Sequence, residues 1–234
     1  MSTTATRVTL RKDLLRTALR MNETGINQGT SGNVSARTTS GFLITPSGLP
    51  YEDTKPEDLV AMRMDGTWEG TFQPSSEWRF HRDIYGARAD VAAIVHTHSV
   101  SATALACLDR AIPPFHYMVA AGGGRDIRCC PYATFGTQEL SDHAVAALDG
   151  RRACLLGHHG VIATGPTLAK ALSLAVEVET LARMYLACLS VGDPELLGDD
   201  EMNRVLEKFT TYGQAHPRLA PTRRPVGMPR YGRP

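Results

Sequence analysis

Two histidines separated by a single residue are the first feature of the chain that could do chemistry. His96 and His98 follow the apolar, β-branched run 91–95, which predicts a buried strand ending at His96. Residues two apart on a strand project to the same side of the sheet, so both imidazoles can reach one cation. A His-x-His pair is also common in packed or exposed positions, so the interpretation depends on further ligands.

A second pair, His158 and His159, follows the apolar run 153–156. Because adjacent strand residues face opposite ways, we expect only one of these two histidines to join His96 and His98. Three imidazoles leave a coordination position open, which is typical of a catalytic rather than a structural zinc site.

Three polar segments predict an anion site near these histidines. Segments 29–33 and 45–48 are loops punctuated by glycine, and segment 75–77, Ser-Ser-Glu, stands at a predicted helix start. Glycine lets the backbone approach an anion closely, and a helix start offers free N–H groups. Each segment alone is an ordinary turn or cap. Together with a metal site, they favour a small phosphorylated substrate.

The pattern of apolar residues predicts helices alternating with short strands in one domain, residues 1–213. Such an order indicates a three-layer α/β/α sandwich around a mixed, largely antiparallel sheet. The expected helices are 10–24, 74–85, 99–108, 137–148, 167–190 and 199–209, and the expected strands are 29–37, 42–45, 91–95 and 153–156, with 161–163 as a further candidate.

The composition narrows the class of protein. With 42% hydrophobic and 21% charged residues and a net charge of +1, the chain has the balance of a soluble globular protein and no general attraction to nucleic acid. It shows no secretory signal and no apolar run long enough to span a membrane, so we expect a cytoplasmic protein. Five cysteines without a Cys-x-x-Cys pair argue against a disulfide framework. The basic, proline-rich tail 214–234 is interpreted as a mobile terminus rather than an anion-binding arm.

The chain resembles the class II aldolase/adducin family, and within it the bacterial enzymes that cleave L-fuculose 1-phosphate. The resemblance runs in order from near residue 10 to residue 213. It is carried by Gly-Thr-Ser-Gly-Asn-Val-Ser (29–35), Leu-Ile-Thr-Pro-Ser-Gly-Leu-Pro-Tyr (43–51), Pro-Ser-Ser-Glu-Trp-Arg-Phe-His (74–81), Val-His-Thr-His (95–98), Ile-Pro-Pro-Phe-His-Tyr-Met (112–118), Pro-Tyr-Ala-Thr-Phe-Gly-Thr (131–137), His-His-Gly (158–160) and Leu-Glu-Lys-Phe-Thr-Thr-Tyr-Gly (206–213).

This resemblance implies a particular site. Zinc, with Mn²⁺ or Co²⁺ as alternatives, is expected on His96, His98 and His159, and on Glu77 when substrate is absent. Glu77 is also expected to transfer protons, with Tyr117 and Tyr212 as further catalytic residues. The phosphate is expected to be bound by Gly32, Asn33, Ser47, Gly48, Ser75 and Ser76. Phe135 and Phe209 are expected on the aldehyde side, and the family's four-fold tetramers place the site at a subunit interface.

The expected reaction is retro-aldol cleavage of a ketose 1-phosphate to dihydroxyacetone phosphate and a short aldehyde. L-fuculose, 5-deoxyribulose and 5-methylthioribulose 1-phosphates all fit the family. Methylthioribulose-1-phosphate dehydratases and pentulose-phosphate 4-epimerases of the family share the histidines and remain alternatives, and an adducin-like scaffold is a third. Schiff-base chemistry is discounted, because none of the four lysines, Lys12, Lys55, Lys170 and Lys208, lies in the polar segments.

Overall fold

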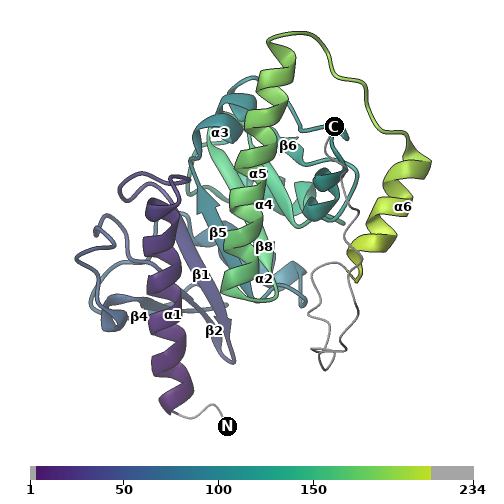
Figure 1. Cartoon of the computed structure of the whole chain (residues 1–234). Coiled ribbons are helices and arrows are strands. Elements are labelled where there is room, and N and C mark those ends of the chain that lie inside the picture. Colours follow the sequence, from purple (N-terminus) through teal and green to yellow (C-terminus); the bar gives the residue numbers. More distant parts are fainter. Residues whose placement is uncertain (1–3, 212–234) are drawn as a thin grey trace, which may run out of the picture.

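One eight-stranded sheet organises the protein, whose computed structural model describes residues 4–211 (Figure 1). The strands lie in the order β4-β3-β2-β1-β5-β8-β7-β6. Every neighbouring pair is antiparallel except β6 and β7, which are parallel. The predicted mixed, largely antiparallel sheet is therefore confirmed. The strands are β1 (Asn33–Thr38), β2 (Gly41–Ile44), β3 (Val60–Arg63), β4 (Trp68–Glu69), β5 (Ala93–Thr97), β6 (Arg128–Cys130), β7 (Ala153–Leu156) and β8 (Gly160–Gly165).

Helices cover both faces of the sheet and enclose two apolar cores. Successive strand residues face opposite layers: in β5, Val95 enters one core and Ile94 the other. The first core is closed by α1 (Thr4–Glu23), α3 (Val100–Cys107), α5 (Leu168–Leu189) and α6 (Asp199–Phe209), and the second by α2 (Trp78–Ala87) and α4 (Gln138–Ala147). This arrangement confirms the three-layer sandwich.

Most differences from the predicted pattern fall on short or polar elements, and in addition α1 begins at Thr4 rather than at Leu10. Strands β3, β4 and β6 were not expected, and neither were the short 3₁₀ helices η1 (Pro56–Asp58) and η2 (Tyr117–Gly122). Helix α2 begins at Trp78 rather than at Pro74, because Pro74 forms an isolated antiparallel bridge with Pro46 that keeps the backbone extended. Tyr212 and the tail 214–234 lie outside the described residues.

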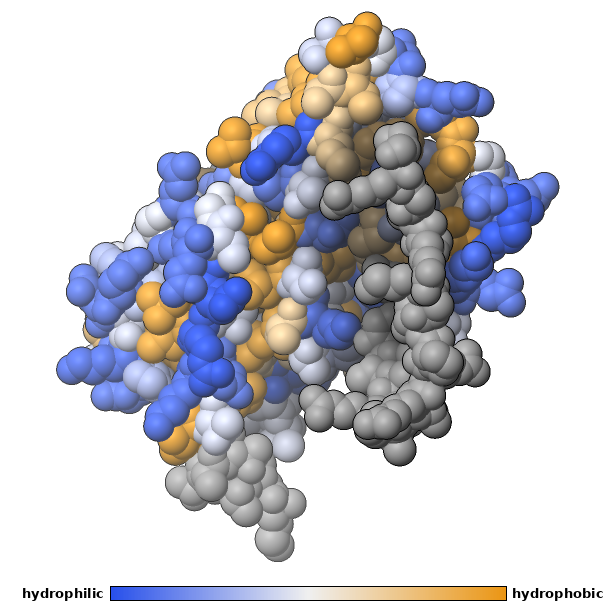
Figure 2. Space-filling view, viewed as in Figure 1, coloured by the Kyte–Doolittle hydropathy of each residue, from blue (hydrophilic) through white to orange (hydrophobic). Residues whose placement is uncertain are grey.

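Helix α1 lies beside α5 across a groove with apolar surface, bordered by hydrophilic side chains (Figure 2). Within residues 4–211, no helix is long and apolar enough to cross a membrane.

Candidate active site

Four side chains from three distant parts of the chain converge at one end of the central strands. Glu77, His96, His98 and His159 each offer one ligand atom, and these atoms lie within 4.8 Å of one another. His96 Nε2 lies 3.0 Å from His98 Nε2 and 3.1 Å from Glu77 Oε2, and His159 Nε2 lies 2.9 Å from Glu77 Oε1. We call these four residues the ligand set.

Strand β5 positions the first two histidines. It is paired on both sides, with β1 and β8, so the end of the strand is held rigidly. His96 is fully buried, and its Nδ1 donates to the carbonyl oxygen of Val161 at 2.9 Å. That bond leaves Nε2 as the nitrogen with a free lone pair facing the other ligands, as metal-binding histidines require. Burial, together with the nearby His96 and His159, lowers the pKa of His98 to about 4, so His98 is neutral at physiological pH.

A tight turn between β7 and β8 selects His159 over His158. We expected strand alternation to separate the pair, but both residues lie in the turn, and the separation arises because His158 adopts a left-handed backbone with φ of 53°. His158 consequently turns toward Asp109, with 3.7 Å between Nε2 and Oδ2. The ring of Tyr132 packs against it at 6.0 Å between centroids.

Glu77 stands at the N-cap of α2 and is 5% exposed. Burial by itself raises the pKa of this carboxyl, but interactions with His96 and His159 outweigh burial and hold the pKa well below its ordinary value. Glu77 is therefore an anion among imidazoles. Within residues 4–211 its buried Oε1 has no hydrogen-bond partner, although His159 Nε2 is close by.

This donor set fits a divalent cation. A buried oxygen without a hydrogen-bond partner and imidazole nitrogens that face one another are unfavourable unless a cation lies between them. Three nitrogens and one carboxylate oxygen match the preferences of zinc and similar first-row metals. The ligand set can therefore hold such an ion.

The three polar segments meet beside the ligand set. The Pro46–Pro74 bridge joins two of them, together with bonds from Ser47 N to the Gln73 carbonyl and from Ser75 N to the Thr45 carbonyl, at 3.0 and 3.1 Å. The third segment, 29–33, runs directly into Val34, which makes two bonds with Thr45.

Within these segments the predicted phosphate ligands occupy different environments. Gly32 is buried, and a Cβ there would lie 2.5 Å from the His96 carbonyl oxygen, so glycine is required. Asn33 and Ser75 are also buried, whereas Ser47, Gly48 and Ser76 are exposed. One amide hydrogen of Asn33 is used by Glu77 Oε2, at 2.9 Å.

A cavity of about 280 Å³ opens over the ligand set. Its lining includes Ser76 and Phe135, both expected from the sequence, and His158, the member of the histidine pair that stays outside the ligand set. It also includes Ser31 and Tyr132, to which the sequence assigned no role of their own. Tyr132 and Phe135 belong to one matched segment, 131–137, and their exposures of 58% and 65% mark them as surface aromatic residues. That segment was the available signal for Tyr132.

Tyr117 and Phe209 do not line this cavity within one chain. Tyr117 is 47% exposed at the start of η2 and, with Phe209, lines a separate cavity of about 560 Å³. Tyr212 lies beyond the described part of the chain.

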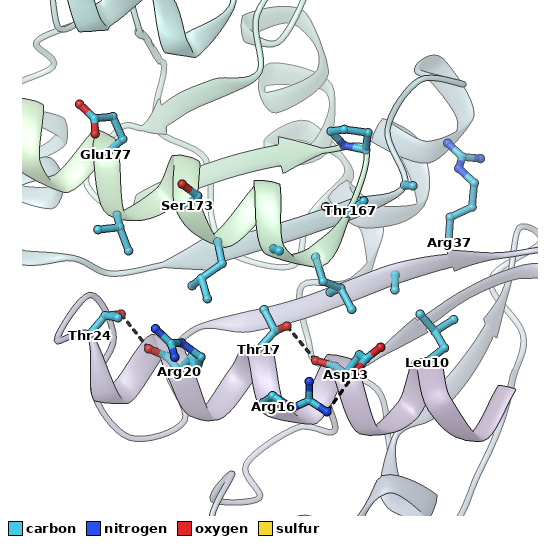
Figure 3. A pocket seen from close by; sticks show the side chains of 17 residues that line it. Leu10, Asp13, Arg16, Thr17, Arg20, Thr24, Arg37, Thr167, Ser173 and Glu177 are labelled. Carbon is cyan, nitrogen blue, oxygen red and sulfur yellow. Dashed lines mark hydrogen bonds and ion pairs between the residues drawn. The ribbon is translucent and has the colours of Figure 1, made fainter. Parts of the chain in front are cut away.

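The groove between α1 and α5 holds a cavity of about 910 Å³, larger than the one over the ligand set (Figure 3). Its walls carry several polar groups that pair with one another: Arg16 reaches Asp13 at 3.1 Å, and the Thr17 hydroxyl donates to the Asp13 carbonyl at 2.8 Å. No member of the ligand set lines it. Volume alone therefore does not mark the chemical site.

Comparison with known proteins agrees with this geometry. Residues 12–186 match the Class II Aldolase and Adducin N-terminal domain. The 5-methylthioribulose-1-phosphate/5-deoxyribulose-1-phosphate aldolase of Rhodospirillum rubrum is 58% identical over 88% of this chain and 94% of its own. The L-fuculose phosphate aldolase of Escherichia coli K12 is 52% identical over 87% of this chain and 95% of its own. A solved L-fuculose 1-phosphate aldolase superposes with a TM-score of 0.84 at 40% identity, covering 86% of this chain and 96% of its own.

Proposed function

The chain belongs to the class II aldolase and adducin family, and from that premise we propose that it cleaves a ketose 1-phosphate by a metal-dependent retro-aldol reaction. The observation that carries the proposal is the ligand set, Glu77, His96, His98 and His159, under a cavity lined by the hydroxyls of Ser31 and Ser76. Such a site provides for a cation and for a polar substrate together.

Zinc is the proposed metal, with Mn²⁺ or Co²⁺ as alternatives. The three histidines would hold it, and Glu77 would complete the set until substrate arrives. A bound divalent cation supplies a Lewis acid for the negative charge that develops beside the substrate carbonyl.

The chain's own residues would move the protons. When the bond between C3 and C4 breaks, its electron pair goes to C3, and the C4 hydroxyl loses its proton as C4 becomes the aldehyde carbon. Tyr212 is the proposed acceptor: it takes that proton as its own hydroxyl proton passes to solvent. Glu77 is an anion among the histidines. Once substrate releases it, Glu77 would take up a proton from solvent and deliver that proton to C3, and a positioned acid or base of this kind typically contributes about 10²–10⁴-fold. The balance needs no oxidant, and the products are dihydroxyacetone phosphate and an aldehyde.

The joined polar segments are proposed to bind the phosphate. Their hydroxyls gather beside the ligand set, where an anion can be held while its sugar reaches the metal; the N–H groups of Ser47 and Ser75 are already bonded between the segments. Asn33 would contribute its second amide hydrogen, since the first is bonded to Glu77. The residues proposed for this role are Gly32, Asn33, Ser47, Gly48, Ser75 and Ser76.

For the substrate we propose pentulose 1-phosphates with a modified C5, namely 5-methylthioribulose and 5-deoxyribulose 1-phosphates, together with L-fuculose 1-phosphate. The names of the Rhodospirillum and Escherichia relatives support this range. The exposed aromatic wall at Phe135 supports an apolar aldehyde half, because a methyl or methylthio group gains by leaving water against a ring.

A homotetramer with shared sites is proposed for the assembly. Tyr117 and Phe209 line a cavity apart from the ligand set of their own chain, so they would contribute to the active site of a neighbouring subunit. Large apolar side chains on and just after α3, Val100 and Leu108, are 66% and 61% exposed, which favours coverage by another subunit.

The decisive experiment is a coupled assay for dihydroxyacetone phosphate with the three substrates offered separately. We expect release from at least one of them, loss of release after chelation, and recovery on adding zinc, manganese or cobalt. Glu77→Gln, close in shape but uncharged, serves as the matched inactive variant. If no substrate releases the product, the aldolase proposal is wrong, and formation of a dehydrated or epimerised sugar phosphate would identify the family's other reactions. Activity that survives chelation would exclude the metal.

The shared site has its own test. Glu77→Gln chains, which are expected to be inactive, and Tyr117→Phe chains, which are expected to be weakly active, are mixed, dissociated and reassembled. Hybrid assemblies regain activity if one subunit supplies the ligand set and its neighbour the tyrosine. Reassembled mixtures no more active than their parents would contradict a shared site.

A further inference from the structure

Strand β1 and helix α2 enclose a row of buried polar side chains that leads away from Glu77. Glu77, His81 and Tyr85 stand four residues apart along α2 and its cap, and Asn33 and Ser35 stand two apart on β1. Four residues of helix rise about 6 Å and two of strand about 6.7 Å, so the two sets interleave. Each of the five is at most 5% exposed. We call this row the buried polar chain.

Every link of the buried polar chain is a short contact. The Tyr85 hydroxyl lies 2.8 Å from Ser35 Oγ, which lies 2.7 Å from His81 Nδ1. His81 Nε2 lies 2.5 Å from Asn33 Oδ1, and Asn33 Nδ2 donates to Glu77 Oε2 at 2.9 Å.

The Glu77 carboxylate, at one end of the buried polar chain, fixes the direction of all four hydrogen bonds. A carboxylate can only accept, so Asn33 must present its NH₂ group to Glu77 and its carbonyl oxygen to His81. His81 must then carry its hydrogen on Nε2 and accept the Ser35 hydroxyl at Nδ1. Ser35 in turn accepts from Tyr85. Burial, with a smaller electrostatic contribution from the nearby His96 side chain, lowers the pKa of His81 to about 3, so the ring stays neutral and keeps this tautomer.

We propose that His81 is a positioning residue that acts through Asn33: it holds the amide so that its NH₂ group keeps Glu77 Oε2 directed toward the metal position. This role rests on the proposed function, in which Glu77 shares the metal. If the amide turned over, its carbonyl oxygen would face the carboxylate and repel it. His81 is fully buried and stacked on Phe80 with 4.7 Å between ring centroids. It therefore acts on the site through its neighbours alone.

The buried polar chain orients groups and does not conduct protons. The amide nitrogen of Asn33 has no lone pair that could accept a proton from one side and release it to the other. The buried polar chain acts as a hydrogen-bond partner of a proposed metal ligand, Glu77. Loss of such a partner typically lowers metal affinity or activity about 10–100-fold.

Two amide variants of His81 distinguish a role in orienting the Asn33 amide from a role in packing the core. His81→Gln places a donor where Nε2 stood and keeps the contact with Asn33, whereas His81→Asn reaches only the Ser35 side. Both are small, polar and uncharged, so they disturb the core to a similar degree. Zinc affinity of each chain is measured by competition with a chromophoric chelator in the absence of substrate, and thermal unfolding is recorded alongside.

We expect zinc to bind His81→Asn about 10–100-fold more weakly than wild type, with His81→Gln within about 3-fold of wild type and similar melting temperatures for both. Equal zinc affinity in the two variants would overturn the proposal. A second measurement needs no variant: spectra of the ¹⁵N-histidine-labelled chain should show His81 protonated at Nε2, and protonation at Nδ1 would overturn it. Because neither measurement uses turnover, a wild type that binds zinc yet releases no dihydroxyacetone phosphate would refute the proposed function and leave this inference to be judged separately.

Discussion

Replacing Glu179 by alanine should destabilise the protein through the helix that follows His98. Ser99 occupies the N-cap of α3 but makes no capping bond with its side chain. The carboxylate of Glu179, on α5 and 5% exposed, takes its place. It accepts from Ser101 N at 3.0 and 3.1 Å and from Ala102 N at 2.9 Å. A negative charge at a helix N-terminus is also favoured by the helix dipole.

The magnitude follows from these contacts. Ala102 is fully buried, so its N–H loses its partner without gaining water, while Ser101 is half-buried and can be hydrated. An unsatisfied buried donor costs about 1–3 kcal/mol, and the truncated side chain adds to this, so we expect a loss of about 2–4 kcal/mol in the free energy of unfolding. For a domain of this size that corresponds to a melting temperature lower by about 4–16 °C. The contact with exposed Arg183, at 3.9 Å, should contribute little.

The assay is urea unfolding followed by circular dichroism, at equal protein concentrations and without metal. Glu179→Gln keeps one acceptor oxygen and should lose about 1 kcal/mol. Glu177→Ala, two residues along the same helix, is the control. Burial raises the pKa of Glu177, so its charge brings no stabilisation to lose, and the change should stay within about 0.5 kcal/mol. If Glu179→Ala unfolds like this control, the carboxylate does not cap α3 and the reasoning fails.

Three further outcomes are expected. Gly32→Ala should lower the free energy of unfolding by more than about 2 kcal/mol, because its Cβ would meet the His96 carbonyl oxygen at 2.5 Å. The control is Gly192→Ala, which has open space around it and should leave the free energy of unfolding unchanged in the same urea titration. Because the folded pKa of His81 is lowered to about 3 from 6.5, the unfolded chain binds the extra proton between these values. Metal-free wild type should therefore lose about 2 kcal/mol more stability than His81→Gln between pH 6.5 and 5, and parallel pH profiles would contradict this. Phe135→Ala should leave unfolding within about 0.5 kcal/mol, since the ring is 65% exposed, while changing the ratio of kcat/KM between 5-methylthioribulose and 5-deoxyribulose 1-phosphates.

Strong local signals made part of the fold predictable. Strand β7 and helix α6 have the bounds expected from the sequence, because an apolar run and an amphipathic pattern flanked by glycine define them. Strands β3, β4 and β6 have two to four residues, several of them polar or exposed, so their pairing with neighbours decides their structure rather than their own pattern.

The ligand set was predictable in composition, although not in its local geometry. His-x-His at a strand end placed two imidazoles on one side of the sheet by spacing, and the further polar segments were needed to interpret them as ligands. The choice between His158 and His159 depends on a left-handed residue in a turn, which strand alternation does not describe. The contact between Asn33 and Glu77 joins residues 44 positions apart, and no local pattern encodes it.

The wall formed by Tyr132 and Phe135 lies outside the sheet, in the segment between β6 and α4, and both rings are mostly exposed. The ligand set, in contrast, is fixed by paired strands and buried contacts. Substitutions in the wall should therefore sacrifice little folding free energy, whereas changes to the ligand set disturb buried contacts. In the proposed function this wall meets the aldehyde half, so the same separation makes positions 132 and 135 natural targets for a combinatorial library that seeks new aldehyde acceptors for carbon–carbon bond synthesis.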